Sequence, residues 1–264
     1  MNVAQALGAL DAREARLLLA QATGFSEASV LAHPEQALPP EAEARFLEFA
    51  ARRAHGEPIA YILGEKEFYG LPLVVNPAVL IPRPETELLV ELALARNPAS
   101  VLDLGTGSGA IALAIKRHLP RARVLGVEAS AAALAVAQRN AVKLGLEVEF
   151  LHGRWLAPVG NARFALIVSN PPYVAEGDPH LSEGDLRFEP RGALVSGADG
   201  LDAIREIARV APAHLEPGRW LLLEHGIGQD EAVRALLQQA GLEDVDTWPD
   251  LAGIARVTGG RLKC

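Results

Sequence analysis

The sequence has little sulfur: one cysteine and one methionine among 264 residues. The cysteine is Cys264, at the end of the chain, so neither an intrachain disulfide nor a cysteine metal site can form. The seven histidines are scattered and show no HExxH-like spacing. That distribution argues against a zinc site, and we expect no bound metal.

Long apolar runs are also absent. No stretch approaches the roughly 18 apolar residues that a membrane-spanning helix needs. The first residues lack the basic start, apolar core and cleavage site of a signal peptide. We therefore expect a mature, cytoplasmic protein that does not enter a membrane.

An excess of positive charge is missing as well. Lysine and arginine number 25 against 33 aspartates and glutamates, which gives a net charge of −8. Proteins that grip long stretches of nucleic acid usually carry a basic footprint. We expect no direct nucleic-acid partner, although the net charge does not exclude a local basic groove. The oligomeric state is not evident from the sequence, and a monomer is our working assumption.

The spacing of apolar residues along the chain changes near residue 75. Before that point, apolar side chains recur at helical spacing. Residues 61–80 then show short apolar runs broken by glycine and proline, which indicates a β-hairpin or an extended linker. We predict a small helical domain with the start of a connecting hairpin at 1–75, and a second domain at 76–264.

The second region alternates strands with helices, a pattern typical of a largely parallel sheet covered by helices on both faces. The predicted fold class is therefore α/β. The expected strands are 101–104, 123–128, 148–152, 164–170, 220–224 and 254–258, and the expected helices are 85–95, 108–119, 130–144, 199–214 and 229–240.

A glycine-rich loop follows the first of these strands. Doubly wound folds bind their ligands at this edge of the sheet, and glycines let a ligand lie against bare main chain. Glu128 ends the second strand about 20 residues later, where a carboxylate can accept both hydroxyls of a ribose. The loop consists of Asp103, Leu104, Gly105, Thr106, Gly107, Ser108 and Gly109.

Two classes of ligand fit such a loop. Gly105, Gly107 and Ala110 also match the looser fingerprint of dinucleotide oxidoreductases. Asp103 favours S-adenosylmethionine, because a carboxylate beside the loop suits a cationic amino-acid moiety and would repel a pyrophosphate. A purely structural glycine turn is the third alternative, and the two flanking acids argue against it.

The fourth strand ends in Asn170, Pro171, Pro172 and Tyr173. The prolines stiffen the backbone and offer no N–H, so nearby carbonyls and the Asn170 oxygen are left to accept hydrogen bonds from a ligand. Tyr173 could supply a flat face for stacking. An ordinary strand-ending turn is the alternative, but the position after the glycine loop favours a site.

The acceptors of this motif match an NH₂ group. An amide nitrogen is a poor nucleophile because its lone pair is delocalised into the carbonyl group. Acceptors for both N–H groups would return electron density to nitrogen and orient it for in-line methyl transfer. We therefore predict methylation of a planar amide or amino nitrogen.

Several blocks of sequence, in order, resemble the HemK/PrmC family of protein glutamine N5-methyltransferases. They are GEPIAYILGEKEFYGLPLVVNPAVLIPRPETELLVE (56–91), DLGTGSGAIALA, VSNPPYV, FEPRGALVSGADGL (188–201) and LLLEHGIGQ (221–229). The resemblance implies a Rossmann-like class I S-adenosylmethionine-dependent methyltransferase domain with a seven-stranded, mostly parallel sheet. It also implies a small N-terminal helical domain and a connecting β-hairpin.

The resemblance further implies a substrate, namely the glutamine in the Gly-Gly-Gln motif of peptide-chain release factors, with S-adenosylhomocysteine as the second product. Glu128 differs conservatively from the aspartate often found there in the family. The helical N-terminal region is expected to recognise the protein partner. Arginines on its helices could contact an acidic partner, or could be solvated surface; they are Arg13, Arg16, Arg45, Arg52 and Arg53.

The residue roles implied by the resemblance fall into two groups. Trp155 would lie beside the adenine, although a core tryptophan is nearly as plausible, and the run 82–86 would line the entrance or simply cap a helix. The expected cofactor-binding residues are Asp103, Gly105, Thr106, Gly107, Ser108, Gly109, Glu128, Trp155 and Asn170. The expected catalytic and substrate-binding residues are Asn170, Pro171, Pro172 and Tyr173, with Arg83 and Glu85 at the entrance.

Other functions stay open. A DNA or RNA methyltransferase acting on an exocyclic amino group would use the same acceptor logic, but it must also extrude a base and bind phosphates. The acidic balance and the lack of a target-recognition insertion argue against it. A non-catalytic cofactor-binding scaffold is disfavoured because Asn170 and Tyr173 are both present.

Overall fold

The computed structural model describes all residues, 1–264. The chain forms two compact units. We call Met1–Glu65 together with Ser182–Phe188 the N-terminal unit, and Lys66–Leu181 together with Glu189–Cys264 the sheet unit.

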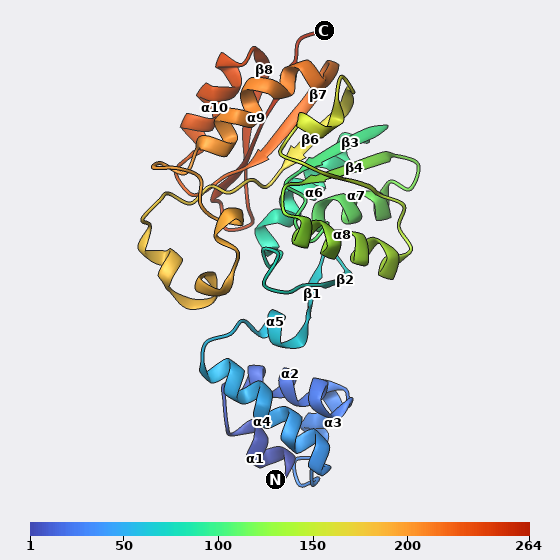
Figure 1. Cartoon of the computed structure of the whole chain (residues 1–264), viewed down its shortest axis with the longest axis vertical. Coiled ribbons are helices and arrows are strands. Elements are labelled where there is room, and N and C mark those ends of the chain that lie inside the picture. Colours follow the sequence, from blue (N-terminus) through green and yellow to red (C-terminus); the bar gives the residue numbers. More distant parts are fainter. The chain divides into compact units, whose positions relative to one another are not determined.

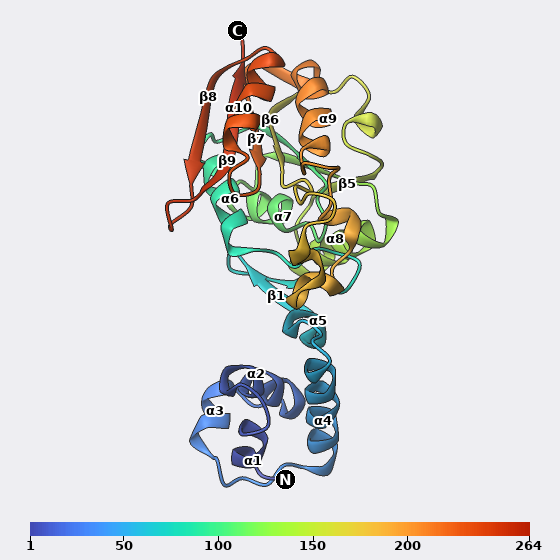
Figure 2. The ribbon, with the colours of Figure 1, turned by 90° about the vertical axis from the view of Figure 1, so that its left-hand side faces the viewer.

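The N-terminal unit is helical, as predicted. Its helices are α1 (Val3–Leu7), α2 (Ala12–Thr23), α3 (Glu27–Ala32), α4 (Pro40–Ala54) and α5 (Ile59–Leu63). The side chains of Asn2, Asp11 and Ser26 accept hydrogen bonds from the first-turn backbone of α1, α2 and α3, which fixes where these helices begin. Helices α1, α2 and α3 lie to one side of α4 (Figure 2).

The N-terminal unit has its own apolar core. Because hydrophobic residues recur every three or four positions, each helix turns one face inward. The buried side chains come from α1 to α5 and the connecting segments: Val3, Ala6, Leu18, Leu19, Ala22, Val30, Leu38, Phe46 and Ile62.

The sheet unit contains a seven-stranded sheet in the order β5-β4-β3-β6-β7-β9-β8. Figure 1 labels β3, β4, β6, β7 and β8 of this sheet. Strands β5, β4, β3, β6 and β7 are parallel, and β9 runs antiparallel to both β7 and β8. This confirms the expected seven-stranded, mostly parallel sheet. The strands are β3 (Ser100–Leu104), β4 (Arg123–Glu128), β5 (Glu149–His152), β6 (Phe164–Ser169), β7 (Leu215–Glu224), β8 (Leu242–Pro249) and β9 (Ala255–Leu262).

Helices cover both faces of this sheet. Alternate residues of β3 point to opposite faces, so Val101 joins a core cluster with α6 and α7 while Leu102 joins another with α9 and α10. The helices are α6 (Glu87–Ala95), α7 (Ala110–His118), α8 (Ala131–Leu144), α9 (Asp202–Val210) and α10 (Asp230–Gln239).

The connecting hairpin, β1 (Glu65–Phe68) and β2 (Leu71–Val74), belongs almost entirely to the sheet unit. Phe68, Leu71 and Leu73 are buried in the core cluster that contains α6 and α7. Along the chain, the boundary between the units therefore falls after Glu65, rather than after residue 75, because the hairpin's apolar side chains pack with the sheet unit.

Several element boundaries differ from the predicted ones: β7 begins at Leu215 rather than at 220, and β9 ends at Leu262 rather than at 258. Helix α7 begins at Ala110 rather than at 108, because Gly109 takes a left-handed conformation and caps the helix. The helix expected at 199–214 is α9 over Asp202–Val210, followed by a 3₁₀ turn at Ala211–His214. The edge strand β8 was not among the predicted strands.

Candidate active site

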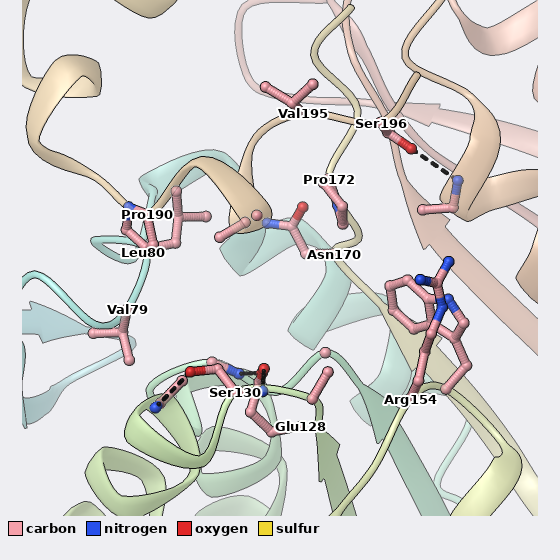
Figure 3. A pocket seen from close by; sticks show the side chains of 18 of the residues that line it. Val79, Leu80, Glu128, Ser130, Arg154, Asn170, Pro172, Pro190, Val195 and Ser196 are labelled. Atoms are coloured by element: carbon pink, nitrogen blue, oxygen red, sulfur yellow. Dashed lines mark hydrogen bonds between the residues drawn. The ribbon is translucent and has the colours of Figure 1, made fainter. Parts of the chain in front are cut away.

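The sheet unit holds a cavity of about 700 Å³ at the carboxyl ends of β3, β4 and β6 (Figure 3). Parallel strands bring their carboxyl ends to one edge, so the loops that follow them line a common space. Gly105 and Gly107 come from the loop after β3, Glu128 from the end of β4, and Asn170 and Pro172 from the segment after β6. Ala78, Val79 and Leu80, which follow the hairpin, form another part of the wall.

Glu128 ties the glycine loop to the end of β4. Its Oε2 accepts a hydrogen bond from the Gly107 backbone N–H at 2.9 Å, and its Oε1 accepts one from the Ser130 N–H at 2.9 Å. The side chain is only partly buried and lies in the cavity wall. It can therefore accept hydrogen bonds from hydroxyl groups of a bound ligand.

Asp103 lies beneath the loop and is not part of the cavity wall. It is fully buried, and its Oδ2 accepts hydrogen bonds from the Thr106 hydroxyl at 2.6 Å and the Ala112 N–H at 3.2 Å. Burial raises the pKa of Asp103 to about 7. The structure thus shows Asp103 bracing the loop and the start of α7, rather than in the cavity wall where we expected it to meet a cationic group.

The glycine loop approaches Trp155 closely. A Cβ atom at Gly105 would lie 3.3 Å from Cζ3 of the indole ring, a tight contact, and the φ of +70° also favours glycine there. Trp155 lines the cavity and also packs against the core cluster with α9 and α10. Its Nε1 is buried without a partner. Trp155 therefore lies both at the cavity wall and at the margin of that core cluster.

Thr106, Ser108 and Gly109 support the loop from outside the cavity. Thr106 and Ser108 are buried, and the Ser108 carbonyl accepts a hydrogen bond from the Asn140 side chain at 2.9 Å. Of the five expected residues from Gly105 to Gly109, only Gly105 and Gly107 line the cavity.

Asn170 lies at the cavity wall, directly after β6 (Figure 3). Its Nδ2 donates to the Thr86 hydroxyl at 3.0 Å, and no protein group donates to its Oδ1. Pro171 is buried, and Pro172 lines the cavity. The site therefore offers an unused amide oxygen beside a proline-stiffened backbone.

Tyr173 is oriented differently from our expectation of a stacking face. It does not line the cavity; its hydroxyl lies 3.5 Å from Oε1 of Glu224. Burial and the nearby Glu224 raise the pKa of the Tyr173 hydroxyl. Its backbone carbonyl accepts a hydrogen bond from Nε2 of Gln229 at 3.0 Å, so this residue anchors the segment to the loop after β7.

Arg83 and Glu85 do not line the cavity either. Arg83 forms an ion pair with Glu189, whose side chain is completely buried, and Glu189 also accepts from the Ile81 N–H at 3.0 Å. Pairing with a buried carboxylate holds the 81–83 backbone in place, next to the wall residues 78–80.

Sequence reasoning missed two residues of this region, Glu189 and Glu224, and expected Thr86 only as part of the entrance run 82–86. Each is buried and polar, and each contacts a partner far away in the sequence. Glu224 alone carried a local signal, since it is an acid directly after the apolar run of β7, at the same edge as Asn170.

The residues fit S-adenosylmethionine better than a metal. The cavity combines bare glycine backbone, a strand-end carboxylate and an indole ring, which suit the methionine, ribose and adenine parts of that cofactor. No group of three histidine, cysteine, aspartate or glutamate side chains could hold a metal ion. No helix is long and apolar enough to span a bilayer.

Comparison with known families matches both regions of the chain. Residues 4–64 match the PrmC N-terminal domain model, and residues 84–184 match the methyltransferase small domain model.

Curated relatives match over nearly the full length. The release factor glutamine methyltransferase of Burkholderia pseudomallei is 53% identical, over 96% of this chain and 93% of the relative. That of Bordetella pertussis is 52% identical, over 94% of each.

Among solved structures, a methyltransferase from Pyrococcus furiosus superposes with a TM-score of 0.60 at 19% identity, over 81% of this chain and 98% of that one. A 16S rRNA methyltransferase of T. Thermophilus, solved with AdoMet and guanosine, gives a TM-score of 0.57 at 25% identity, over 75% and 50%.

Fold, cavity and relatives together define an S-adenosylmethionine-dependent methyltransferase of class I. Within that class, the chain belongs to the release factor glutamine methyltransferase family. The resemblance identified in the sequence is thereby confirmed.

Proposed function

We propose that this enzyme methylates the side-chain amide nitrogen, N5, of the glutamine in the Gly-Gly-Gln motif of peptide-chain release factors. The observation that carries the proposal is the free Oδ1 of Asn170 in a cavity continuous with the glycine loop. The relatives named release factor glutamine methyltransferase supply the substrate class.

In this proposal the glycine loop and β4 hold the cofactor. Gly105 and Gly107 lie against its methionine part, Glu128 accepts hydrogen bonds from the ribose, and Trp155 packs beside the adenine. The buried residues Asp103, Thr106, Ser108 and Gly109 act indirectly, by fixing the loop. The bound cofactor supplies an electrophilic methyl group on a sulfonium sulfur.

The substrate amide is held by acceptors. The Oδ1 of Asn170 and a backbone carbonyl of the Asn170–Pro171 segment accept the two N–H hydrogens, and Pro172 forms the adjacent wall. This pairing returns electron density to the nitrogen and aims it along the line of displacement. The methylated nitrogen is acidic and loses its proton to water, so we assign no general base. Tyr173 and Arg83 hold the segments around the site, and Glu85 lies in the 3₁₀ turn that follows Arg83.

The N-terminal unit is the proposed recognition surface for the protein partner. Arg16, Arg52 and Arg53 are paired with glutamates of the same unit. Arg13 and Arg45 are exposed and without such partners, so they are the arginines left for an acidic surface. We place the enzyme in the cytoplasm, acting on its protein substrate as a monomer and without nucleic acid.

The decisive experiment is methyl transfer from labelled S-adenosylmethionine to a bacterial release factor. The matched control is the same factor with its Gly-Gly-Gln glutamine replaced. We expect label on the intact factor alone. Label on nucleic acid with none on the factor would instead support the exocyclic-amine methyltransferase.

A further inference from the structure

Glu189 is a buried carboxylate that the proposed chemistry does not use. Its side chain is completely buried, and each of its oxygens accepts a hydrogen bond from the segment that precedes α6. Oε2 accepts from the Ile81 backbone N–H at 3.0 Å, and Oε1 accepts from Nη2 of Arg83. A carboxylate is costly to remove from water unless it is paired and hydrogen-bonded, so Glu189 depends on these partners.

The two stretches of chain that Glu189 joins both form cavity wall. Residues 78–80 line the cavity directly before Ile81, and Pro190 lines it directly after Glu189. Figure 3 shows Pro190 beside Leu80, as the bond between Glu189 and Ile81 requires. Glu189 therefore holds one stretch of wall against the other.

The stretch of wall that begins at Pro190 is also held at its far end. A 3₁₀ turn over Arg191–Ala193 follows the proline. The Leu194 carbonyl then accepts from the Val174 N–H at 2.8 Å, and the Ser196 N–H donates to the Val174 carbonyl at 2.9 Å. Backbone that is fixed at both ends before binding has less freedom to lose when a partner docks.

The cofactor side of the cavity is tied together by other bonds. Glu128 joins the Gly107 and Ser130 backbone there. These bonds involve neither Glu189 nor Arg83. Breaking the Glu189–Arg83 pair should therefore loosen the wall and leave the cofactor-binding residues in place.

We propose that Glu189 is a positioning residue for the protein substrate: by pairing with Ile81 and Arg83 it preforms the wall against which the glutamine-bearing segment of the release factor docks. This inference rests on the proposed function. Because the Glu189 side chain is completely buried, it cannot touch the factor and acts only through the wall.

The first test is Glu189→Gln in the full-length enzyme, assayed with an intact release factor. An ionised carboxylate offers two acceptor oxygens, whereas an amide offers one and turns its NH₂ group toward the second donor. One of the two bonds, to Ile81 or to Arg83, is therefore lost. We expect KM for the release factor to rise about tenfold, with kcat and the affinity for S-adenosylhomocysteine within about twofold of the unmodified enzyme.

Arg83 gives a second, independent approach to the same pair. Arg83→Met removes the guanidinium from a partly exposed position, and we expect KM to rise by a similar factor. Arg83→Lys keeps a cation and should bring KM most of the way back. In the double variant Arg83→Met, Glu189→Gln the two effects should not multiply, because both changes break the same pair.

The matched control is Asp250→Asn. The Asp250 carboxylate also accepts from an arginine, Nε of Arg256 at 3.0 Å, and from a backbone N–H, that of Ile254 at 3.0 Å. Asp250 does not line the cavity, so its variant should keep the KM of the unmodified enzyme. Calorimetric titration with S-adenosylhomocysteine establishes that each variant has a folded cofactor site.

Three results would overturn the inference. The first is a KM for Glu189→Gln no higher than that for Asp250→Asn; if Glu189→Gln does not fold, the same comparison with Arg83→Met decides. The second is a multiplied effect in the double variant, which would mean that Arg83 acts independently of Glu189. The third is a loss of affinity for S-adenosylhomocysteine as large as the rise in KM.

Each of these results leaves glutamine methylation by the unmodified enzyme intact, so the proposed function would stand alone. Absence of that methylation would instead remove the proposed function and this inference together.

Discussion

At the scale of single residues, Glu128 joins two backbone N–H groups at the end of β4, those of Gly107 and Ser130. Its replacement by alanine removes both the proposed ribose acceptor and the tie to the loop. We expect Glu128→Ala to weaken S-adenosylhomocysteine binding by about 2 kcal/mol, roughly thirtyfold in Kd, with a much smaller change in kcat. Isothermal titration calorimetry measures the affinity.

Glu149→Ala is the matched control for this variant. Glu149 is exposed on the neighbouring strand β5, where it pairs with Arg123 at 3.3 Å. Its loss should leave cofactor affinity unchanged. Equal affinities for the Glu128 variant and the unmodified enzyme would refute the ribose assignment.

Asp103 gives a prediction about stability and pH. Its pKa is raised to about 7 in the folded protein, so between the ordinary aspartate pKa and 7 the folded state holds a proton that the unfolded state has lost. The free energy of unfolding therefore falls as pH rises through that window. Asp103→Asn cannot ionise and escapes this loss. Its stability relative to the unmodified enzyme should improve from pH 5 to pH 8, as measured by urea unfolding.

One outcome of the Asp103→Asn experiment would contradict this prediction. A difference in unfolding free energy that stays constant between the two pH values would mean that the carboxyl group titrates normally, despite its burial. Its hydrogen bonds from Thr106 and Ala112 would then outweigh desolvation.

At the scale of elements, Gly109 sets the start of α7 and its approach to α8. It has a φ of +84°, and a Cβ there would lie 3.0 Å from Cδ1 of Leu113 and 3.3 Å from Cβ of Ala137. Gly145, which ends α8, has a φ of +63° with nothing within 4 Å. A left-handed non-glycine residue costs about 1–2 kcal/mol, so Gly145→Ala should lose that much and Gly109→Ala clearly more. Urea unfolding compares the two; equal losses would show that α7 shifts freely away from α8.

Periodicity predicted most elements of the sheet unit because they are long and mostly buried. The exception is β8, at the sheet edge, where Glu243, Asp244 and Asp246 are exposed and the pairing with β9 is irregular between Glu243 and Asp246. An edge strand buries few side chains, so neither an apolar run nor strict alternation marks it in the sequence. Its existence followed only from the family resemblance.

The candidate site was predictable to the extent that its residues lie in local motifs at strand ends. Gly105, Gly107, Glu128 and Asn170 line one cavity because parallel strands align their carboxyl ends. The orientation of Tyr173 was not predictable. It depends on Glu224, and nothing local in the sequence indicates which distant side chain will meet a tyrosine ring.

At the scale of the whole molecule, the chain contributes separate cores to its two units. The buried residues of the N-terminal unit belong to none of the core clusters of the sheet unit. Ser182–Phe188 also belongs to the N-terminal unit, where Arg53 contacts Asp185 at 3.4 Å. The segment between β6 and α9 thus contributes residues to both units. No local sequence pattern indicated this division.

Because the cores are separate, damage to one unit should leave the chemistry of the other intact. Phe46 is completely buried in the N-terminal unit, and Phe46→Ala should destabilise that unit by about 3–5 kcal/mol. If this unit recognises the release factor, the variant should keep its affinity for S-adenosylhomocysteine while kcat/KM for the factor falls.

Phe164→Ala supplies the contrasting change, since Phe164 is completely buried at the start of β6 in the sheet unit. The space left by the removed ring, as in Phe46→Ala, should weaken both cofactor binding and methyl transfer. The reason is that Asn170 directly follows the other end of β6. The pair separates recognition from catalysis. If Phe46→Ala leaves kcat/KM for the release factor unchanged even where its unit is shown to be unfolded, the N-terminal unit takes no part in recognition.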